Sequence, residues 1–437
     1  TKNQENTITQ EKRLWPLSND VRSKQFIKLF KDEEGNYESM VQRVYRQIQS
    51  VDEHANITIA TSKSQASAIK NQLGEKVEIC VEPCRRDTFP AILLASAYLH
   101  DELGVSENEC VVVCPVDPYV DNTYYEAVKQ LEELVSKNTA NLTLMGIEPT
   151  YPSEKYGYII PESSEKVSVV KEFKEKPDTE TAKKYLGMRA LWNAGVFAFR
   201  LGYLLEKAHS FVDFTDYREL YEKYETLTKI SFDYAVVEKE SSIQVMRYHG
   251  DWKDVGTWNM MAEVMADDIK GKAIMDETCH NTQIINELNI PILCMGCKDM
   301  VIAASGDGIL VSDKERSGYM KPYVEKIGSE AMFAEKSWGT YTVMDAQPGS
   351  MTVKVSMNAG NQMSYHSHHY REEVWTVIGG SGIAVVDGME QMLRTGDVLT
   401  IAAGCKHTVK ATTNLDIIEV QLGESISAED KYKHPFE

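Results

Sequence analysis

The feature that most constrains the fold of this chain is an alternation of short apolar runs with longer amphipathic stretches. β-Branched runs recur at intervals of roughly 20 to 35 residues, as expected for strands. They are Ile57–Ala60, Val77–Val81, Val111–Cys114 and Leu142–Met145. Between them, apolar residues at three- and four-residue spacing predict helices. These stretches are Tyr37–Ser50, Ser62–Leu73, Phe89–His100 and Asn122–Lys137. Strands that alternate with helices predict an α/β domain whose sheet is mostly parallel and covered by helices.

The pattern changes twice further along the chain. From Lys272 the helical periodicity fades, and short runs such as Ile302–Ala304 and Gly308–Val311 alternate with turn residues. From Gly328 on, strand-like runs follow one another with glycine turns, which is typical of an all-β domain. We therefore expect an α/β domain over residues 1–271, a small β-rich linker region over 272–327, and an all-β domain over 328–437.

The composition excludes several classes of protein. The formal net charge of −19 disfavours nonspecific binding to nucleic acid, because that binding depends on clustered Lys and Arg. No run of about 18 apolar residues could span a bilayer, and Thr1–Lys12 lacks the apolar core of a secretory signal. We therefore expect a cytoplasmic protein with no nucleic-acid or membrane partner. Eight scattered cysteines favour reduced thiols over a disulfide framework, and the pair Cys294 and Cys297 lacks the second pair that a zinc site needs.

Asp117 directly follows an apolar run, at the end of an expected strand. Ligands of parallel α/β sheets bind at the carboxyl ends of strands, and a carboxylate there could hold Mg²⁺ against a triphosphate. Taken alone, such an aspartate more often caps a helix or forms a turn. An ordered series of motifs changes this weighting. The motifs are Arg13–Ser18, Ser23–Phe26, Glu82–Ala91, Pro115–Asp117, Tyr156–Tyr158, Phe173–Pro177, Trp192–Gly195, Ser231–Tyr234 and Trp252–Trp258.

This series resembles the sugar-1-phosphate nucleotidyltransferase family and implies a Rossmann-like nucleotidyltransferase domain. In such an enzyme an oxygen of the sugar-1-phosphate attacks the α-phosphorus of a nucleoside triphosphate, and pyrophosphate leaves. Catalysis of this kind is mainly positioning and charge neutralisation. The Trp15 form of the first motif and the all-β tail favour the mannose-1-phosphate guanylyltransferase branch. The implied substrates are therefore GTP and mannose-1-phosphate.

The resemblance also implies a task for each matching residue. The implied catalytic set is Arg13 and Lys24, which would neutralise the triphosphate, with Asp117 and Asp254, which would share Mg²⁺. The implied substrate contacts are Glu82 and Arg86 near the nucleotide base, Gly157 with Glu175 and Asn193 at the sugar, and Lys176 at the sugar phosphate.

One departure from the family concerns the residues before Arg13. The family has a glycine-rich phosphate loop there, whereas residues 1–12 contain no glycine. Glycines let backbone N–H groups approach phosphates closely, and Glu11 would add a repelling charge. A catalytically impaired homologue that serves assembly or sugar binding therefore stays open as an alternative.

The all-β part carries both cupin motifs in order. Gly360, His366, His368, Glu373 and Gly380 have the spacing of the first motif, and Gly396, Gly404 and His407 have that of the second. Histidines at i and i+2 of a strand point to the same face. Three imidazoles and one carboxylate suit Zn²⁺, Mn²⁺, Fe²⁺ or Ni²⁺. The sequence therefore predicts a cupin β-barrel in which His366, His368, Glu373 and His407 hold a transition metal. The alternative is a barrel kept for folding or oligomer contacts.

This C-terminal part resembles that of the bifunctional phosphomannose isomerase and guanylyltransferase enzymes. The likeness lies in Glu335–Tyr341, Arg371–Trp375 and Glu419–Glu424. In that group a terminal arginine matters for isomerisation, and the matching stretch Glu429–Glu437 contains none. Because isomerisation needs a group that stabilises the enediolate, we expect the transferase. A bifunctional or isomerase-only enzyme is the alternative. The apolar residues of Met351–Val355 leave a homodimer open.

Overall fold

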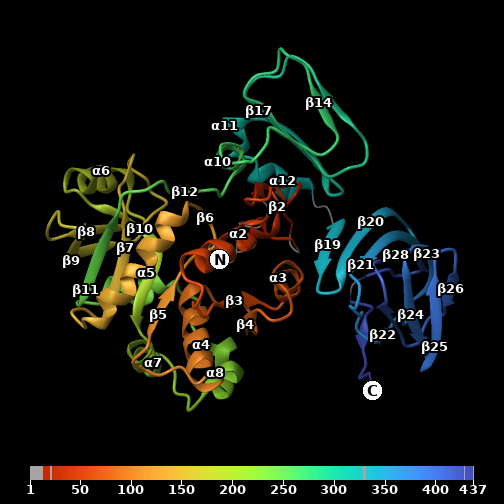
Figure 1. Cartoon of the computed structure of the whole chain (residues 1–437), viewed down its shortest axis with the longest axis horizontal. Helices are drawn as coiled ribbons and strands as arrows, with labels where there is room; N and C mark the ends of the chain where they lie inside the picture. The colour runs from red at the N-terminus through yellow and green to blue at the C-terminus, as the bar shows by residue number, and fades with distance from the viewer. Residues whose placement is uncertain (1–12, 20–21, 328–330, 428, 437) are drawn as a thin grey trace. The chain divides into compact units, whose positions relative to one another are not determined.

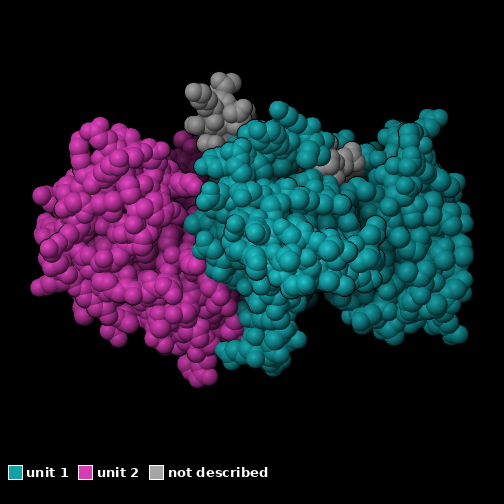
Figure 2. All heavy atoms as spheres, turned by 90° about the horizontal axis from the view of Figure 1, so that it is seen from above, with its two compact units in different colours: residues 1–39, 67–75, 256–437 teal, residues 40–66, 76–255 magenta. Residues whose placement is uncertain are grey.

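The computed structural model describes residues 13–19, 22–327, 331–427 and 429–436. The chain forms two compact units, which Figure 2 colours separately. The first unit comprises residues 1–39, 67–75 and 256–437, and the second comprises residues 40–66 and 76–255. Among the described helices, none combines the length and the apolar character needed to cross a membrane.

The second unit is built on a six-stranded sheet in the order β5-β10-β7-β11-β9-β8 (Figure 1). Its strands are β5 (Cys110–Val113), β7 (Leu142–Ile147), β8 (Tyr158–Pro161), β9 (Val167–Lys174), β10 (Leu191–Arg200) and β11 (Ile243–Tyr248). β7 is buried along its whole length and pairs in parallel with β11, which is also buried. A strand covered on both faces reads as a continuous apolar run, which is how the β7 segment stood out in the sequence.

The expected α/β architecture is confirmed, but the expectation of a mostly parallel sheet is wrong. β5 and β7 both pair antiparallel with β10, and β9 pairs antiparallel with β8 and with β11. Parallel strands need a long crossover connection. β8 and β9 are joined by residues 162–166 alone, so this connection can make only a hairpin. Apolar periodicity identifies strands but does not encode their direction.

Helices pack on this sheet and at its ends. They are α2 (Met40–Val51), α4 (Thr88–Asp101), α5 (Asn122–Ser136), α6 (Thr179–Gly187), α7 (Leu201–His209), α8 (Tyr217–Lys223) and α9 (Phe232–Ala235), with 3₁₀ turns η2 (Tyr224–Thr226) and η3 (Val237–Lys239). Asp87 and Asp121 accept backbone N–H bonds at the starts of α4 and α5, as N-cap residues do. Phe89 of α4 lies in a core cluster with Phe199 of β10 and Phe232 of α9.

Two short ladders complete the second unit. β3 (Thr58–Ser62) pairs in parallel with β4 (Glu78–Glu82), and β6 (Pro118–Tyr119) pairs antiparallel with β12 (Lys253–Asp254). The β6–β12 ladder joins segments that lie far apart in the sequence, which makes it important for the site described below.

The first unit contains the expected β-rich linker region. Its strands are β13 (Ile269–Lys270), β14 (Ala273–Met275), β15 (Gln283–Asn286), β16 (Ile292–Cys294), β17 (Met300–Ser305) and β18 (Gly308–Asp313). β13, β15 and β17 pair in parallel, whereas β17 and β18 form an antiparallel hairpin. The other elements of this unit outside the barrel are η1 (Lys24–Phe26), β1 (Phe30–Lys31), β2 (Tyr37–Glu38), α3 (Ala66–Leu73), α10 (Trp258–Ala262), α11 (Lys314–Ser317) and α12 (Lys321–Ile327).

The all-β part of the first unit has the two-sheet architecture expected of a cupin. One sheet contains β19 (Phe333–Lys336), β20 (Gly339–Gln347), β21 (Ser350–Met357), β28 (Leu415–Gly423), β23 (Arg371–Gly379) and β26 (Val398–Ile401). The other contains β25 (Met389–Arg394), β24 (Ser381–Val386), β27 (His407–Ala411), β22 (His366–Ser367) and β29 (Tyr432–Lys433). Buried residues alternate with residues that are at least partly exposed along β23 and β28, because successive side chains of a strand point to opposite faces. The inward residues include Trp375 and enclose one core cluster.

Candidate active site and metal centre

The short β6–β12 ladder brings the two predicted Mg²⁺ ligands to adjacent positions. Asp254 of β12 pairs with Pro118 of β6, and Asp117 directly precedes Pro118. Residues that face each other across an antiparallel pair have their Cβ atoms about 5 Å apart. The backbone segments that carry these two carboxylates are therefore adjacent in the second unit although they lie far apart in the sequence, and carboxylate oxygens are ligands that suit Mg²⁺.

An aromatic group adjoins Asp254. Burial raises the pKa of the Tyr156 phenol, and the negative charge of Asp254 raises that pKa further. The Tyr156 ring packs against Trp192, with ring centroids 4.9 Å apart, and against Trp252 at 5.4 Å. Trp192 is 4% exposed, and its indole N–H has no hydrogen-bond partner among the described residues. A buried donor without an acceptor is costly. The aromatic group of Tyr156, Trp192 and Trp252 therefore contains an N–H to which a ligand could supply an acceptor.

The three predicted sugar contacts, Gly157, Glu175 and Asn193, lie together next to this aromatic group. The backbone N–H of Asn193 donates to the carbonyl of Gly157 at 2.8 Å. A methyl group added at Gly157 would lie 2.5 Å from Glu175 Oε2 and 3.4 Å from Asn193 Cβ. Lys176 Nζ donates to Glu175 Oε1 at 2.6 Å, and the Glu175 side chain is only 5% exposed whereas that of Lys176 is 54% exposed. Gly157 is therefore required for Glu175 to reach its position.

A β-bulge sets the position of Asn193 in β10. Asn193 pairs with Gly146 and Phe197 pairs with Leu144, so the register shifts between them. Gly195, inside the bulge, has a φ of 71°, and its N–H donates to Asn193 Oδ1 at 3.1 Å. Bulges re-aim side chains and are frequent beside functional sites. Here the extra residues of the bulge bring the Gly195 N–H onto the side-chain amide of Asn193.

The structure adds Asp233, to which the sequence assigned no task. Asn193 Nδ2 donates to Asp233 Oδ1 at 2.7 Å. Burial raises the pKa of Asp233 to about 7, the charge of Glu175 acts in the same direction, and Lys176 opposes them. The available signal was the motif Ser231–Tyr234, in which Ser231 accepts the N–H of Tyr234 and caps α9. We call Gly157, Glu175, Lys176, Asn193 and Asp233 the sugar-end cluster.

Glu82 and Arg86 contact another segment of the second unit. Glu82 ends β4 and accepts a hydrogen bond from the Tyr224 hydroxyl at 2.9 Å, and burial raises its pKa. Arg86 donates to the backbone carbonyl of Glu225. Both predicted nucleotide contacts are thus held by the turn at residues 224–225.

Arg13 and Lys24 belong to the first unit, and the residues before Arg13 that lack glycine lie outside the described part of the chain. Arg13 is exposed at the start of a turn whose next residues are buried. This turn is fixed within its own unit, because Trp258 Nε1 donates to the Trp15 carbonyl at 2.9 Å and Ser305 Oγ donates to the Pro16 carbonyl at 2.7 Å. A methyl group on Gly308 of β18 would lie 2.4 Å from the Trp15 ring, so the linker hairpin packs directly on this turn.

The predicted cupin ligands converge inside the barrel. His366 of β22 pairs directly with His407 of β27, and the ligand nitrogens of His366, His368 and His407 all lie within 4.8 Å of one another. Their Nδ1 atoms bond the backbone carbonyls of Ser364, Asp430 and Cys405, respectively. Because a carbonyl only accepts, each Nδ1 carries the proton and each Nε2 keeps its lone pair, which is how metal-binding histidines are oriented.

Glu373 completes this group, which we call the histidine cluster: His366, His368, Glu373 and His407. Glu373 Oε1 is 3.0 Å from His368 Nε2, and its Oε2 is 3.3 Å from His407 Nε2. His407 Nε2 is buried and has no hydrogen-bond partner among the described residues. Burial lowers the pKa of His366 to about 2, so that ring stays neutral as a metal ligand must. Lone pairs that face a carboxylate without an intervening proton fit a cation between them.

Arg371 is a neighbour of the histidine cluster that the sequence did not single out. Its Nε donates to Glu373 Oε1 at 3.4 Å, and its Nη1 donates to the Ser427 carbonyl at 2.8 Å. Its Nη2 lies 3.2 Å from His368 Nε2. The signal was the run Arg371–Trp375, in which residues two apart share a strand face.

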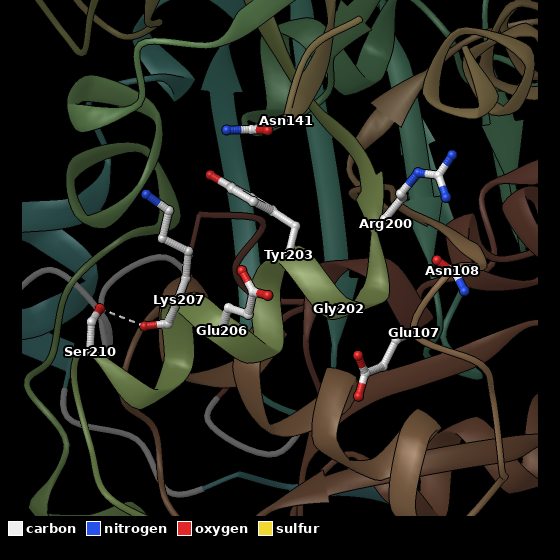
Figure 3. Close-up of a pocket in the computed structure, with 9 residues that line it drawn as sticks. All are labelled: Glu107, Asn108, Asn141, Arg200, Gly202, Tyr203, Glu206, Lys207 and Ser210. Atoms are coloured by element: carbon white, nitrogen blue, oxygen red, sulfur yellow. Dashed lines mark hydrogen bonds between the residues drawn. The ribbon is translucent and has the colours of Figure 1, made fainter. Parts of the chain in front are cut away.

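A polar pocket of about 590 Å³ lies elsewhere in the second unit (Figure 3). It is lined by Arg200, at the opposite end of β10 from Asn193, and by Tyr203 and Lys207 of α7. The Tyr203 hydroxyl and Lys207 Nζ donate to Glu240 at 2.7 Å and 3.0 Å. These polar groups already have protein partners, and the pocket contains none of the predicted site residues.

Comparisons with known proteins identify the families that the two parts of the chain resemble. The nucleotidyl transferase family matches residues 10–271, and the family of mannose-6-phosphate isomerase C-terminal domains matches residues 328–434. The xanthan biosynthesis protein XanB of Xanthomonas campestris pv. campestris (strain B100) is 30% identical over 455 residues, covering 96% of this chain and 94% of that protein.

Two further relatives extend the likeness. A mannose-1-phosphate guanylyltransferase of Klebsiella pneumoniae is 27% identical and covers 96% of this chain and 95% of its own length. A crystal structure described as mannose-1-phosphate geranyltransferase from Thermus thermophilus superposes with a TM-score of 0.61 at 26% identity, covering 73% of this chain and 97% of that one.

Proposed function

Because this chain belongs to the nucleotidyl transferase family, we propose that it is an enzyme that forms GDP-mannose and pyrophosphate from GTP and mannose-1-phosphate. The observation that carries the proposal is the β6–β12 ladder, in which Asp254 pairs with the residue after Asp117. Asp254 of this ladder interacts with Tyr156, and Tyr156 directly precedes Gly157 of the sugar-end cluster in the sequence. The residues proposed to hold the metal and those proposed to hold the sugar thus belong to the same unit.

The reaction exchanges one phosphoryl bond for another. A phosphate oxygen of mannose-1-phosphate bonds to the α-phosphorus of GTP, and the bond from that phosphorus to the oxygen bridging the α- and β-phosphates breaks, so that pyrophosphate leaves with the electron pair. Mg²⁺, held by Asp117 and Asp254, would neutralise charge on the phosphates. Arg13 and Lys24 would neutralise the triphosphate as charge moves onto pyrophosphate. No covalent protein intermediate is needed.

The sugar-end cluster supplies the groups that hold the second substrate. Glu175 Oε2 faces the bare backbone of Gly157, and Asn193 keeps one amide N–H and one lone pair beyond its protein contacts. These groups can bond sugar hydroxyls, and the half-exposed Lys176 ammonium can pair with the sugar phosphate. Glu82 and Arg86 would contact the nucleotide. Holding both substrates in line lowers the entropic part of the barrier.

The choice of base and sugar rests on the relatives. The Klebsiella pneumoniae protein is named for mannose-1-phosphate and a guanylyl group, and the XanB protein is named for xanthan biosynthesis. The proposal places this chain in the supply of nucleotide sugar for a polysaccharide, acting in the cytoplasm.

A pyrophosphate-release assay tests the proposal. Full-length protein with a verified N-terminus is given Mg²⁺ and each pairing of GTP, ATP, UTP or dTTP with mannose- or glucose-1-phosphate. We expect GTP with mannose-1-phosphate to give the highest kcat/KM. Release from a different pair would revise the substrates, and no release from any pair would contradict the transferase and favour the impaired homologue.

We also propose that the histidine cluster holds a transition metal. Support comes from the orientation of the three imidazoles and from the buried His407 Nε2, which has no partner among the described residues. Metal analysis of protein purified without chelators, followed by titration of the stripped protein with Zn²⁺ and Mn²⁺, tests this. A stoichiometry of one per chain that His407→Ala abolishes is the expected result, and equal uptake by wild type and variant would contradict it.

A further inference from the structure

The Asp233 carboxyl occupies a position in the sugar-end cluster that the proposed chemistry does not use. It is carried by α9, whose start is capped by Ser231 and whose Phe232 is buried in the main core of the unit. Its Oδ1 accepts the hydrogen bond from Asn193 Nδ2 at 2.7 Å. The core thus fixes α9, and α9 delivers a carboxyl oxygen to the one amide side chain of the cluster.

Asp233 and Gly195 together fix the orientation of the Asn193 amide. The amide nitrogen donates to Asp233, while the amide oxygen accepts the Gly195 N–H at 3.1 Å. An exchange of the amide oxygen and nitrogen would point two donors at each other at Gly195, whatever the protonation state of Asp233. The remaining N–H and lone pair of Asn193 therefore have fixed places, which is what selective recognition of a hydroxyl pattern requires.

The charges around Asp233 are unbalanced when all groups are ionised. Glu175 and Asp233 are acidic, and Lys176 is the cation whose ammonium bonds Glu175. From η3, Glu238 accepts the Glu175 N–H at 3.1 Å and bonds Lys174 at 3.3 Å, which adds another acidic group on that side. From α9 itself, Tyr234 faces Lys176. A sugar phosphate that approaches Lys176 meets less negative charge when Asp233 carries a proton.

We propose that Asp233 is a positioning residue for the sugar-1-phosphate: it orients Asn193 toward the sugar hydroxyls, and its neutral form admits the phosphate beside Glu175. This inference rests on the proposed function. The pKa of Asp233, raised to about 7 by burial and by Glu175, supports it, because the neutral form is then abundant at and below neutral pH. As the pH rises through that pKa, the second carboxylate appears and affinity for the sugar phosphate falls.

Two variants of Asp233 and one control separate orientation from charge. Asp233→Asn keeps an oxygen that can accept from Asn193 but cannot ionise, whereas Asp233→Ala removes both properties. Asp213→Asn is the control, since Asp213 is an exposed acidic residue of the same unit. The readouts are kcat and the KM values for the nucleotide and the sugar-1-phosphate, measured from about pH 6 to about pH 8.5, a range that brackets the raised pKa. The substrates are the pair that the pyrophosphate-release assay selects.

The expected pattern is specific to the sugar. With Asp233→Ala, KM for the sugar-1-phosphate rises about ten-fold at every pH because a hydrogen bond to the site amide is lost, and KM for the nucleotide stays within about two-fold. For the wild type, KM for the sugar-1-phosphate rises as the pH passes through neutrality. With Asp233→Asn it stays flat apart from the change due to the substrate phosphate, which titrates near pH 6 in both proteins. Asp213→Asn follows the wild type.

Other results would overturn the inference. An equal rise in both KM values, or a loss of kcat alone, would make Asp233 merely structural. Matching pH profiles for the wild type and Asp233→Asn would remove the role of its charge. Circular dichroism checks that the variants fold. If Asp233→Ala does not fold, the comparison of Asp233→Asn with the wild type is sufficient for the test. A wild type that releases no pyrophosphate with any substrate pair contradicts the proposed function itself, and this inference with it.

Discussion

The sugar-end cluster and the histidine cluster both bury carboxyl groups, but with opposite electrostatic results. In the sugar-end cluster, Asp233 meets a second carboxylate, and burial and that charge raise its pKa to about 7. In the histidine cluster, burial would raise the pKa of Glu373, but its contacts with His368 and His407 hold that pKa well below its usual range. The Trp375 indole also donates to Glu373, at 3.0 Å. Burial alone thus does not set the charge of a carboxyl group; the neighbouring charges and hydrogen bonds also decide it.

The two clusters also differ in how open they are. Lys176 is 54% exposed, whereas the side chains of His368, His407 and Glu373 are at most 3% exposed. An open cluster with an exposed cation suits a substrate that comes and goes. A closed cluster of fixed nitrogen and oxygen atoms suits a group that stays bound. The following experiments test this contrast.

The largest expected effect is the loss of transferase activity in Asp254→Asn. Removal of one charged ligand from the phosphate site should lower kcat by about 10²–10³-fold, the range seen when a charge-stabilising group is removed. Steady-state pyrophosphate release measures it. Asp251→Asn, which changes an exposed aspartate three residues away, is the matched control. If both variants keep wild-type kcat, the ladder is not the phosphate site.

Gly157→Ala should lower activity less than Asp254→Asn does, and it should do so by weakening the use of the sugar-1-phosphate. The added methyl group would lie 2.5 Å from Glu175 Oε2, so Glu175 must move, and kcat/KM for the sugar-1-phosphate should fall about 100-fold, as small misplacements at active sites do. Gly187→Ala is a control, because nothing lies within 4 Å of its added methyl group. An unchanged kcat/KM in Gly157→Ala would show that Glu175 does not contact the sugar.

His407→Ala should weaken metal binding at the histidine cluster by at least the roughly 10–100-fold caused by loss of a supporting residue. Titration of stripped protein with Zn²⁺ measures the affinity. His369→Ala is the control, since His369 is exposed. The contrast between the clusters predicts that pyrophosphate release does not follow the metal content of the barrel. A parallel loss of both would mean that the two clusters work together.

The smallest effect is expected from Ser231→Ala. The Ser231 hydroxyl caps the helix that carries Asp233, and loss of such a cap costs about 1 kcal/mol of stability. Thermal unfolding should show a small decrease in the melting temperature, together with a rise in KM for the sugar-1-phosphate smaller than that of Asp233→Ala. A rise as large as in Asp233→Ala would indicate that Ser231 itself contacts the sugar.

The pH dependence of stability sharpens the same comparison. The pKa of Asp233 is about 7 in the folded protein against an ordinary value of 3.8, so between those values the folded state binds more protons than the unfolded state. Its contribution to the free energy of unfolding therefore falls as the pH rises through this window. Denaturant unfolding of the wild type and Asp233→Asn should differ most at and above neutral pH, with the variant more stable. Equal pH dependence would show that Asp233 ionises normally.

Motifs predicted much of this molecule because they combine a residue type with a spacing. Histidines two apart, with Glu373 and His407 at cupin spacing, were found together in the barrel. The family resemblance implied that Asp117 and Asp254 share Mg²⁺; the β6–β12 ladder brings their segments together, and the shared ion stays a prediction. Sheet direction was not predictable, because apolar alternation is the same in parallel and antiparallel strands. The role of Asp233 was hidden for a similar reason: an aspartate just inside a helix start reads as an N-terminal charge, and its bond to Asn193 depends on a bulge in a distant strand.

The contact between Trp15 and the linker hairpin has a consequence for how this chain can be divided. The turn after Arg13 rests on Ser305 and Gly308, which lie beyond residue 271, where the transferase family match ends. A fragment that ends there would retain every residue of the proposed transferase site. It would still lose Ser305 and Gly308, on which the turn after Arg13 packs. The linker hairpin thus supports the N-terminal turn, and a fragment designed for expression should extend through this hairpin, beyond the end of the family match.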